Sequence, residues 1–549
     1  MGSMSPPKRV LLLTNSEHGQ ANVYLATAYA LLTLEDEDVE VHFASFAPIR
    51  KFVETTSQHA LQDNSRARPI IFHEIDGVDM MSAWSRPEIA EEQQDLDRQV
   101  NMFRIVNAIR RMQVLLKVTL PWTGPEFVQI FRSVTDIVQG VRSDIIAVDP
   151  AFSPALTALR HINEKFIILS PNTIKDFAMP LQPNGEALWK YPCVGKGFDY
   201  PVPWRLIPIN IFLIFLTIII GSIFDSHRRS IQRYVAEQAD GAKLTTLNDL
   251  SLNPNLGIKF LVANREEIEF PLRVIPPHII PCGPMIRPAK PVAEVDPDFA
   301  KWLARGPTLY INLGTHAALN ERFAAEMATA IRIVLDHARS VLWRDKRLAG
   351  LQVLWKLTKE GEYEVLEPGS AIYKILGREI RKGTVRVVDW IEAEPTAVLE
   401  TQTVICAVHH GGANSFLETL SAGIPQVVLP VWMDTFDFAR RAELLGIGRW
   451  GNRLANKTCK GGELGPILID VLLGGKASAY ARRAKELAAI CNEHGGGRVF
   501  AARHILAEIQ EYHRREEQQA EAEEDSDCAK QEEKPLLNGK SNGALLREG

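Results

Sequence analysis

The feature that most restricts the fold of this sequence is a repeated alternation of short apolar segments with helical patterns. Val10–Leu13 is an apolar run, a helical pattern follows from about Asn22 to Thr33, and Val39–Phe43 alternates apolar with polar residues. Asp144–Val148 and Phe166–Leu169 are further apolar segments of strand length. Because parallel strands buried under helices produce this pattern, the first half predicts a doubly wound parallel sheet.

The second half of the chain repeats the pattern. A helical pattern covers Glu321–His337, and five segments are predicted strands: Thr308–Asn312, Val353–Lys356, Val385–Val388, Val404–Val408 and Gln426–Leu429. Ligands of such sheets bind outside the carboxyl ends of the strands. We therefore expect an α/β protein of two Rossmann-like domains that face a central cleft.

Proline density and charge divide the chain further. Prolines crowd the segment Ile275–Pro284 and interrupt both helical and strand patterns, which predicts a linker. Beyond residue 515 the chain is rich in Glu and Gln with few large apolar residues, a composition typical of disorder. The predicted parts are an N-terminal domain (1–275), a proline-rich linker (276–300), a C-terminal domain (301–490), a C-terminal helix (491–515) and a disordered acidic tail (516–549).

Composition excludes several classes of function. A net charge of -5 over 549 residues leaves no basic footprint for nucleic acid. The six cysteines are scattered without a CxxC pair, which favours reduced thiols over a disulfide framework or a zinc site. The N-terminal segment lacks the apolar length of a secretory signal. A cytoplasmic location is therefore expected.

The densest chemical signal is the segment His409–Ser415, which reads His-His-Gly-Gly-Ala-Asn-Ser. It follows a predicted strand, and a helix is expected to open near Asn414. Free N–H groups at a helix N-terminus, next to a glycine such as Gly412 that allows close approach, form an anion site. The two histidines and the serine add side-chain donors, and Glu418 lies one turn farther along the same helical face. A ligand-free turn is the alternative, since glycine turns are common.

This segment resembles the donor signature of the UDP-glycosyltransferase family, a family of GT-B fold (glycosyltransferase family 1) that includes plant secondary-metabolite and fungal sterol enzymes. The signature begins at a Trp and continues as His-x-Gly-x-Asn-Ser, a Glu, Gly-(Val/Ile)-Pro and Pro-x-x-x-Asp. The chain matches it, as a member of fungal type, at Trp390, His410, Gly412, Asn414, Ser415, Glu418, Gly423, Pro425, Pro430 and Asp434.

The resemblance implies a role for each of these donor residues. Trp390 would stack on uracil, Glu418 would bind the ribose, and Asp434 would bind hydroxyls of the sugar. The diphosphate would be held by residues from two turns, the second of which resembles the family's Phe-Gly-Ser loop: His410, Asn414, Ser415 and Thr315.

The chain departs from the family at two places in this signature. Trp390-Ile-Glu-Ala replaces the family's Trp-x-Pro-Gln, with about two extra residues before the histidines. Thr435 follows Asp434 where many plant members have Gln, so the donor hexose stays open, with glucose expected.

A second group of candidates lies in the first half of the chain. His18 follows the first strand and Asp149 follows the strand Asp144–Val148, so both should emerge at one edge of the sheet. A histidine that is oriented by a carboxylate can deprotonate an acceptor hydroxyl near neutral pH. The family has a Gly-His segment and a later Asp at these places, although Glu17 replaces the glycine here.

These residues predict an inverting reaction without a metal or other cofactor. His18 would take the acceptor proton, and the anion site would stabilise the departing diphosphate. Asp-x-Asp pairs, which often bind a metal in other transferases, occur at Asp36, Asp296 and Asp525. All three fall in an expected loop, linker or tail and are interpreted as chance.

The segment 206–224 contains no charged residue and is mostly Ile, Leu and Phe. Its length would allow a membrane span, but a single span would separate the two halves of the enzyme. Pro208 and Asn210 also weaken its first turns. We expect a helix that dips into the cytosolic leaflet or lines a hydrophobic acceptor pocket, with a buried core helix as the alternative.

The sequence thus predicts a UDP-sugar-dependent hexosyltransferase that acts on a hydroxyl of a small lipophilic acceptor, such as a sterol, terpenoid, polyketide or phenolic. The expected partners are the UDP-sugar, that acceptor and a membrane surface, without nucleic acid. The alternatives are a catalytically inactive, membrane-associated scaffold of the same fold and a transferase that uses a lipid-linked sugar.

Overall fold

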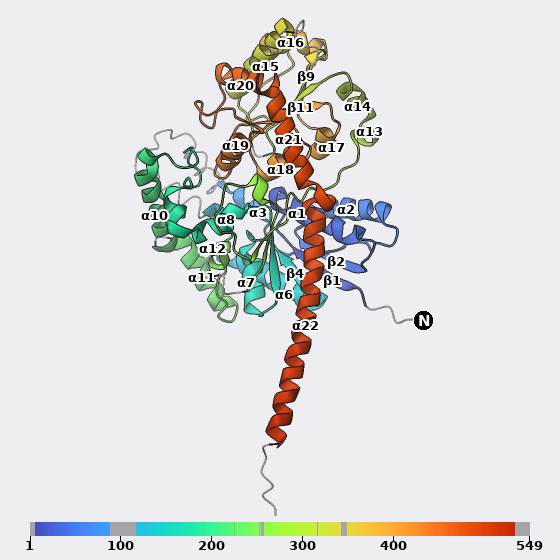
Figure 1. The fold of residues 1–549 in the computed structure, drawn as a ribbon, viewed down its shortest axis with the longest axis vertical. Coiled ribbons are helices and arrows are strands. Elements are labelled where there is room, and N and C mark those ends of the chain that lie inside the picture. The colour runs from blue at the N-terminus through green and yellow to red at the C-terminus, as the bar shows by residue number, and fades with distance from the viewer. Residues whose placement is uncertain are drawn as a thin grey trace, which may run out of the picture. The chain divides into compact units, whose positions relative to one another are not determined.

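The computed structural model describes residues 6–87, 117–223, 225–251, 253, 257–315, 317–341 and 348–532. These residues form two separate parallel sheets, as Figure 1 shows. In sheet order, the first sheet consists of β3 (Ile71–Glu74), β2 (Val39–Ser45), β1 (Lys8–Leu13), β4 (Ile145–Val148), β5 (Phe166–Ser170), β6 (Phe260–Val262) and β7 (Ile279–Pro281). The second consists of β10 (Val385–Val388), β9 (Gln352–Lys356), β8 (Thr308–Asn312), β11 (Val404–His409), β12 (Gln426–Val428) and β13 (Gly448–Trp450).

Helices connect the strands, which pair in parallel throughout both sheets. Those of the first half are α1 (His18–Thr33), α2 (Arg50–Asp63), α3 (Met80–Trp84), α6 (Gly124–Val141), α7 (Ser153–His161), α8 (Ile174–Ala178), α9 (Glu186–Trp189), α10 (Ile207–Ile223), α11 (Ser226–Gln238) and α12 (Leu247–Ser251). Those of the second half are α13 (Val292–Val295), α14 (Pro297–Leu303), α15 (Glu321–Val341), α16 (Ala371–Arg381), α17 (Pro395–Glu400), α18 (Ala413–Ser421), α19 (Thr435–Leu444), α20 (Gly461–Leu472), α21 (Ala477–Cys491) and α22 (Gly496–Glu532). The predicted class, two doubly wound parallel-sheet domains, is confirmed.

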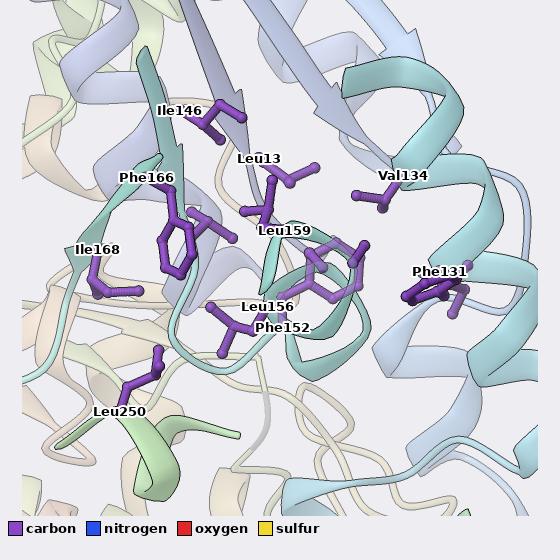
Figure 2. Packing of buried hydrophobic residues seen from close by; sticks show 14 of the residues in the cluster. Leu13, Phe131, Val134, Ile146, Phe152, Leu156, Leu159, Phe166, Ile168 and Leu250 are labelled. Atoms are coloured by element: carbon purple, nitrogen blue, oxygen red, sulfur yellow. The ribbon is translucent and has the colours of Figure 1, made fainter. Parts of the chain in front are cut away.

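Apolar side chains from strands and helices form the core of the first half. Figure 2 shows Leu13 and Ile146 from adjacent strands facing α6 and α7, which contribute Phe131 and Leu156. These side chains are at most 5% exposed. Burial of each side chain stabilises the fold by about 1.5–3 kcal/mol. This packing holds the strands, and therefore their ends, in fixed positions.

The proline-rich range 276–300 is not a linker throughout, which corrects the sequence-based prediction. Ile279–Pro281 pairs with β6 as the edge strand β7, and α13 and α14 begin within the same range. An edge strand tolerates Pro281 because one side of it has no neighbour that needs the missing N–H. Prolines therefore end elements here without excluding them.

The predicted disordered tail is also wrong in part, because α22 continues through residues 516–532. Glu, Gln, Ala and Lys are strong helix formers, and this propensity outweighs the lack of apolar residues. The chain divides into two compact units, residues 1–502 and 503–549, with the boundary inside α22. The predicted range 533–549 lies outside the described residues.

Within the apolar segment 206–224, Ile207–Ile223 forms α10, and residue 224 lies outside the described part. Asn210, which we expected to weaken the helix, is fully buried and forms hydrogen bonds with the segment that precedes the helix. Its Oδ1 accepts from the Cys193 N–H at 2.8 Å, and its Nδ2 donates to the carbonyls of Leu188 and Tyr191. One face of α10 stays exposed, which excludes a fully buried core helix: Ile209, Phe212, Phe215, Ile218 and Ile219 are 39–53% exposed. Among the described helices, none has both the length and the apolar character to cross a membrane.

Candidate functional site

Five neighbouring strands of the second sheet bring candidate residues to one edge. The order β10-β9-β8-β11-β12 is followed at the carboxyl ends by one group per strand. These groups are, in the same order, Trp390, Lys356, the turn Gly314–Thr315, His410 and Asp434. The sheet therefore aligns an aromatic ring, a cation, a glycine-containing turn, a histidine and a carboxyl group along one edge.

His409 holds the turn between β11 and α18 through two hydrogen bonds of its ring. The buried His409 ring accepts from the Gly411 N–H through Nδ1, so Nε2 carries the proton and donates to Gln426 Oε1 at 2.6 Å. Burial lowers the pKa of His409 to about 4 and keeps the ring neutral. Of the two adjacent histidines, this one is structural, which corrects our expectation that both serve as donors to an anion.

The N-terminus of α18 is open to a ligand. Its N-cap is Gly412, which supplies no side-chain cap, so the first N–H groups of the helix lack a side-chain partner at the cap position. Asn414 and Ser415 lie in this first turn and are partly exposed. Such a helix start attracts anions through its aligned N–H groups.

The His410 ring packs against the backbone of both turns. A Cβ atom on Gly314 would lie 2.8 Å from His410 Cε1, and one on Gly412 would lie 2.5 Å from Nε2. Gly314 also has a φ of +82°, a conformation that strains other residues. Glycine at these two positions therefore lets the histidine sit between β8 and β11, beside the exposed Thr315.

Trp390 offers an open ring face at the end of the row. It is 62% exposed, and the Lys356 ammonium lies 5.0 Å from its ring centroid. The ring is thus available for stacking, although the residues after it differ from the pattern in related sequences.

Two carboxyl groups complete the second-sheet edge. Loss of hydration raises the pKa of the partly buried Glu418 to about 7, with Glu394 adding to the rise. Asp434 is exposed, yet the surrounding protein displaces enough water to raise its pKa to about 7 as well, and Asp176 contributes. Thr435 is fully buried, and its hydroxyl is bonded to the backbone of Trp432. Its side chain therefore serves the turn, while Glu418 and Asp434 are available to hydroxyl groups.

The first-sheet edge carries His18 and Asp149, as the sequence predicted. His18 is the first residue of α1, four residues earlier than the expected helical pattern, because Glu17 caps the helix by accepting from the Gln20 N–H. The His18 ring contacts Phe52 edge-on at 4.6 Å between centroids.

Asp149 is completely buried at the base of the loop that carries His18. Its Oδ2 accepts from Thr14 Oγ1 at 3.0 Å and from Asn15 Nδ2 at 2.6 Å, and its Oδ1 accepts from the Ala151 N–H. Burial raises the pKa of Asp149 to about 7. Asn15 in turn accepts from the Glu17 N–H, which links Asp149 to the residue before His18. A direct pairing of Asp149 with His18 stays a prediction.

The two edges meet at α1 and α18. Asn414 Nδ2 donates to the His18 carbonyl at 3.3 Å, although the residues are 396 positions apart. A second link joins α8 to α19, where Lys175 Nζ lies 2.6 Å from Asp437 Oδ2. The backbone of His18 is thereby placed beside the first turn of α18.

Sequence reasoning missed four residues of this region: Asn15, Phe52, Lys175 and Lys356. Lys356 had a detectable signal, because it is a charged residue at the end of a buried strand on the ligand edge. The Asp-x-Asp pair at Asp296 has a structural use, since Asp296 caps α14 by accepting from the Phe299 N–H.

Comparison with known proteins identifies the family. Residues 378–460 match the model described as "Erythromycin biosynthesis protein CIII-like, C-terminal domain", which spans the second-sheet edge. Over 514 residues the chain is 32% identical to Glycosyltransferase sdnJ of Sordaria araneosa, covering 90% of this chain and 96% of that protein. The chain belongs to the UDP-glycosyltransferase family. It is a transferase with the GT-B fold.

Other proteins that are similar to this UDP-glycosyltransferase support the same family and fold. It is 26% identical over 223 residues to UDP-glycosyltransferase 84B2 of Arabidopsis thaliana, covering 38% of this chain and 45% of that protein. Among solved structures, a UDP-glucosyltransferase from Polygonum tinctorium superposes with a TM-score of 0.57 at 16% identity, covering 92% of this chain and 99% of that one. This last likeness supports the fold.

Proposed function

We propose that this UDP-glycosyltransferase transfers a hexose, glucose in the first instance, from UDP to a hydroxyl group of a small lipophilic acceptor with inversion at the anomeric carbon. The observation that carries the proposal is the row of groups along the second sheet. A nucleotide whose base stacks on Trp390 and whose phosphates reach the start of α18 would extend along this row. Its sugar would then lie toward Asp434.

Each donor residue has a proposed task. His410, Thr315 and the first turn of α18, with Asn414 and Ser415, would donate to the diphosphate. Glu418 would bind the ribose. Asp434 would bind hydroxyl groups of the hexose, and the buried Thr435 would hold that turn in place. We propose that no metal or cofactor is needed, because these donors face the charge that develops on the leaving diphosphate.

His18 is the proposed general base. It would take the proton of the acceptor hydroxyl, whose oxygen bonds to the anomeric carbon as the bond to the diphosphate breaks. The electron pair of that bond would stay on the phosphate oxygen. Asp149 would act through the loop of Thr14 and Asn15 to hold His18 in place.

The acceptor class rests on apolar surface in the first half. Phe52 lies against the His18 ring and offers an apolar wall to the reacting hydroxyl. The exposed face of α10 is the proposed contact for a greasy acceptor or for the membrane that holds it. Removal of this apolar face should raise the KM for a lipophilic alcohol and leave the KM for the UDP-sugar unchanged.

Titration of the protein with UDP by calorimetry, with and without EDTA, tests the donor site. We expect EDTA to leave the affinity unchanged, and His410→Ala to weaken UDP binding about 10- to 100-fold, the value of one lost charge-assisted hydrogen bond. Binding that disappears in EDTA would contradict the metal-free proposal. No binding in either condition would favour a scaffold or a lipid-linked donor.

A further inference from the structure

Lys356 is a buried cation without a counter-ion. Its side chain lies at the end of β9, and the residue is 9% exposed. Within the described part of the chain, no carboxylate lies within 4.0 Å of its ammonium. Its contacts are the Gly314 carbonyl, 3.4 Å from Nζ, and the Trp390 ring.

A second buried lysine shows what is missing. Lys175 has a 3% exposed side chain and contacts Asp437 at 2.6 Å and Asp176 at 3.5 Å. Burial alone would lower its pKa, but these carboxylates raise it well above the usual value. For Lys356, burial acts alone and lowers the pKa. A buried charge is costly unless it is paired, and a carbonyl with an aromatic face pairs it only in part.

The position of Lys356 indicates which anion would pair with its ammonium group. Lys356 is paired in register with Asn312, the last residue of β8, and the turn that follows β8 contains Gly314 and Thr315. On its other side lies Trp390, after β10. The ammonium therefore stands between the proposed base platform and the proposed phosphate turn, at the open end of a parallel sheet.

We propose that Lys356 binds the donor nucleotide through its diphosphate and supplies the cation that neutralises this group. The inference rests on the proposed function, since it assumes that UDP occupies this edge. When the bond to the anomeric carbon breaks, its electron pair adds negative charge to the same diphosphate. A lysine that contacts this group would stabilise the departing UDP more than the bound UDP-sugar.

Calorimetric titration with uridine and with UDP separates phosphate binding from base binding. We expect Lys356→Met to weaken UDP binding about 10- to 100-fold and to leave uridine binding within about twofold of the unchanged protein. Lys359→Met is the matched control. Lys359 also contacts a carbonyl at 3.4 Å and an aromatic ring at 5.9 Å, both of Tyr363, but it is exposed. The control should bind both ligands normally.

Thermal unfolding provides a readout that a purely structural lysine would not give. Without ligand, Lys356→Met should have a Tm equal to or above that of the unchanged protein, because an unpaired buried charge is removed. The increase in Tm caused by saturating UDP should shrink at the same time.

Equal losses of uridine and UDP affinity would overturn the inference, since Lys356 would then only support the Trp390 ring. Unchanged UDP affinity in Lys356→Met would overturn it as well. If the unchanged protein itself fails to bind UDP, the proposed function fails first and the inference with it.

Discussion

The carboxyl edges of the two sheets are built in opposite ways. In the first sheet, Thr14, Asn15 and Asp149 are fully buried and bonded to one another. In the second sheet, Trp390 and Asp434 are exposed, and Lys356 is a buried cation that has no carboxylate partner in the part of the chain that the structure describes. The buried groups of the first edge are bonded within the chain, whereas the second edge presents exposed groups and a buried lysine that has no carboxylate partner among the described residues.

The two edges should respond differently to substitution. Substitutions at the open edge should alter ligand binding, because the missing partner is the ligand. Substitutions in the closed edge should alter turnover or stability, because its partners are other parts of the chain. Substitutions of His18, Asp149 and Lys175 test that division.

The largest effect is expected for His18→Ala. Removal of a general base costs about 10²- to 10⁴-fold in rate, so transfer to the acceptor should fall by about 10³-fold. UDP affinity should change less than about threefold, because His18 belongs to the first edge. Steady-state rates and UDP calorimetry on the same variant measure both. Full activity in His18→Ala would show that His18 is not the general base.

The second effect concerns the pH dependence of stability through Asp149. Its pKa in the folded chain is about 7, above the unfolded value near 4, so the fold favours the protonated form. The stabilisation is complete below about pH 4 and is lost as the pH rises through about 7, by roughly 2–4 kcal/mol for a displacement of this size.

Denaturant unfolding between pH 4 and 8 measures this dependence. The unchanged protein should lose unfolding free energy over this range relative to Asp149→Asn, which cannot ionise. Parallel pH profiles for the two proteins would show that folding does not raise the pKa of Asp149. The transfer rate of Asp149→Asn should also be lower at pH 7 if an ionised carboxylate orients His18.

The smallest effect is expected at the contact between the edges. Lys175→Met leaves Asp437 buried but still bound to Arg440, 2.6 Å away. The free energy of unfolding should therefore fall by about 1–3 kcal/mol. Complete loss of a buried ion pair costs more, about 3–5 kcal/mol. Because Asp437 lies one turn after Asp434 on α19, the KM for the UDP-sugar should rise at the same time.

A matched pair elsewhere sharpens this test. Glu379 has a 2% exposed side chain and contacts Arg332 and Arg339, which lower its pKa to about 2 against the effect of burial. Glu379→Gln should lower the Tm and leave the KM unchanged. A rise in KM for both variants would mean that general loosening of the fold, and not the link between the edges, affects the donor.

The sequence predicted the strands that carry the site better than the strands around them. Every predicted strand is present, with ends displaced by at most two residues. The missed strands β3, β6, β7 and β13 have three or four residues and lie at or next to the edges of their sheets. The edge strand β7 also contains Pro281, a residue that argues against a strand in a sequence-based prediction.

The candidate residues of the second edge could be selected from the sequence where they lie close together along the chain and resemble the family signature. The row from His410 to Asp434 lies on one strand-turn-helix unit and the strand after it, so local order fixes it. Lys356 and Lys175 depend on which strands and helices are neighbours, and Asn15 depends on a partner 134 residues away. Such contacts arise from tertiary packing and leave no pattern in neighbouring residues.

The hydrogen bonds among Thr14, Asn15 and Asp149 at the first edge can form early in synthesis of the chain. The strands of the first sheet end at Pro281, so 268 of the 549 residues remain to be made when that sheet is complete. At about 5–20 residues per second, the ribosome needs roughly 15–50 s for them. The bonds of Asp149 to Thr14, Asn15 and Ala151 all lie within residues made by then. The bonds that hold this loop therefore do not depend on the later part of the chain that brings Asn414 to His18.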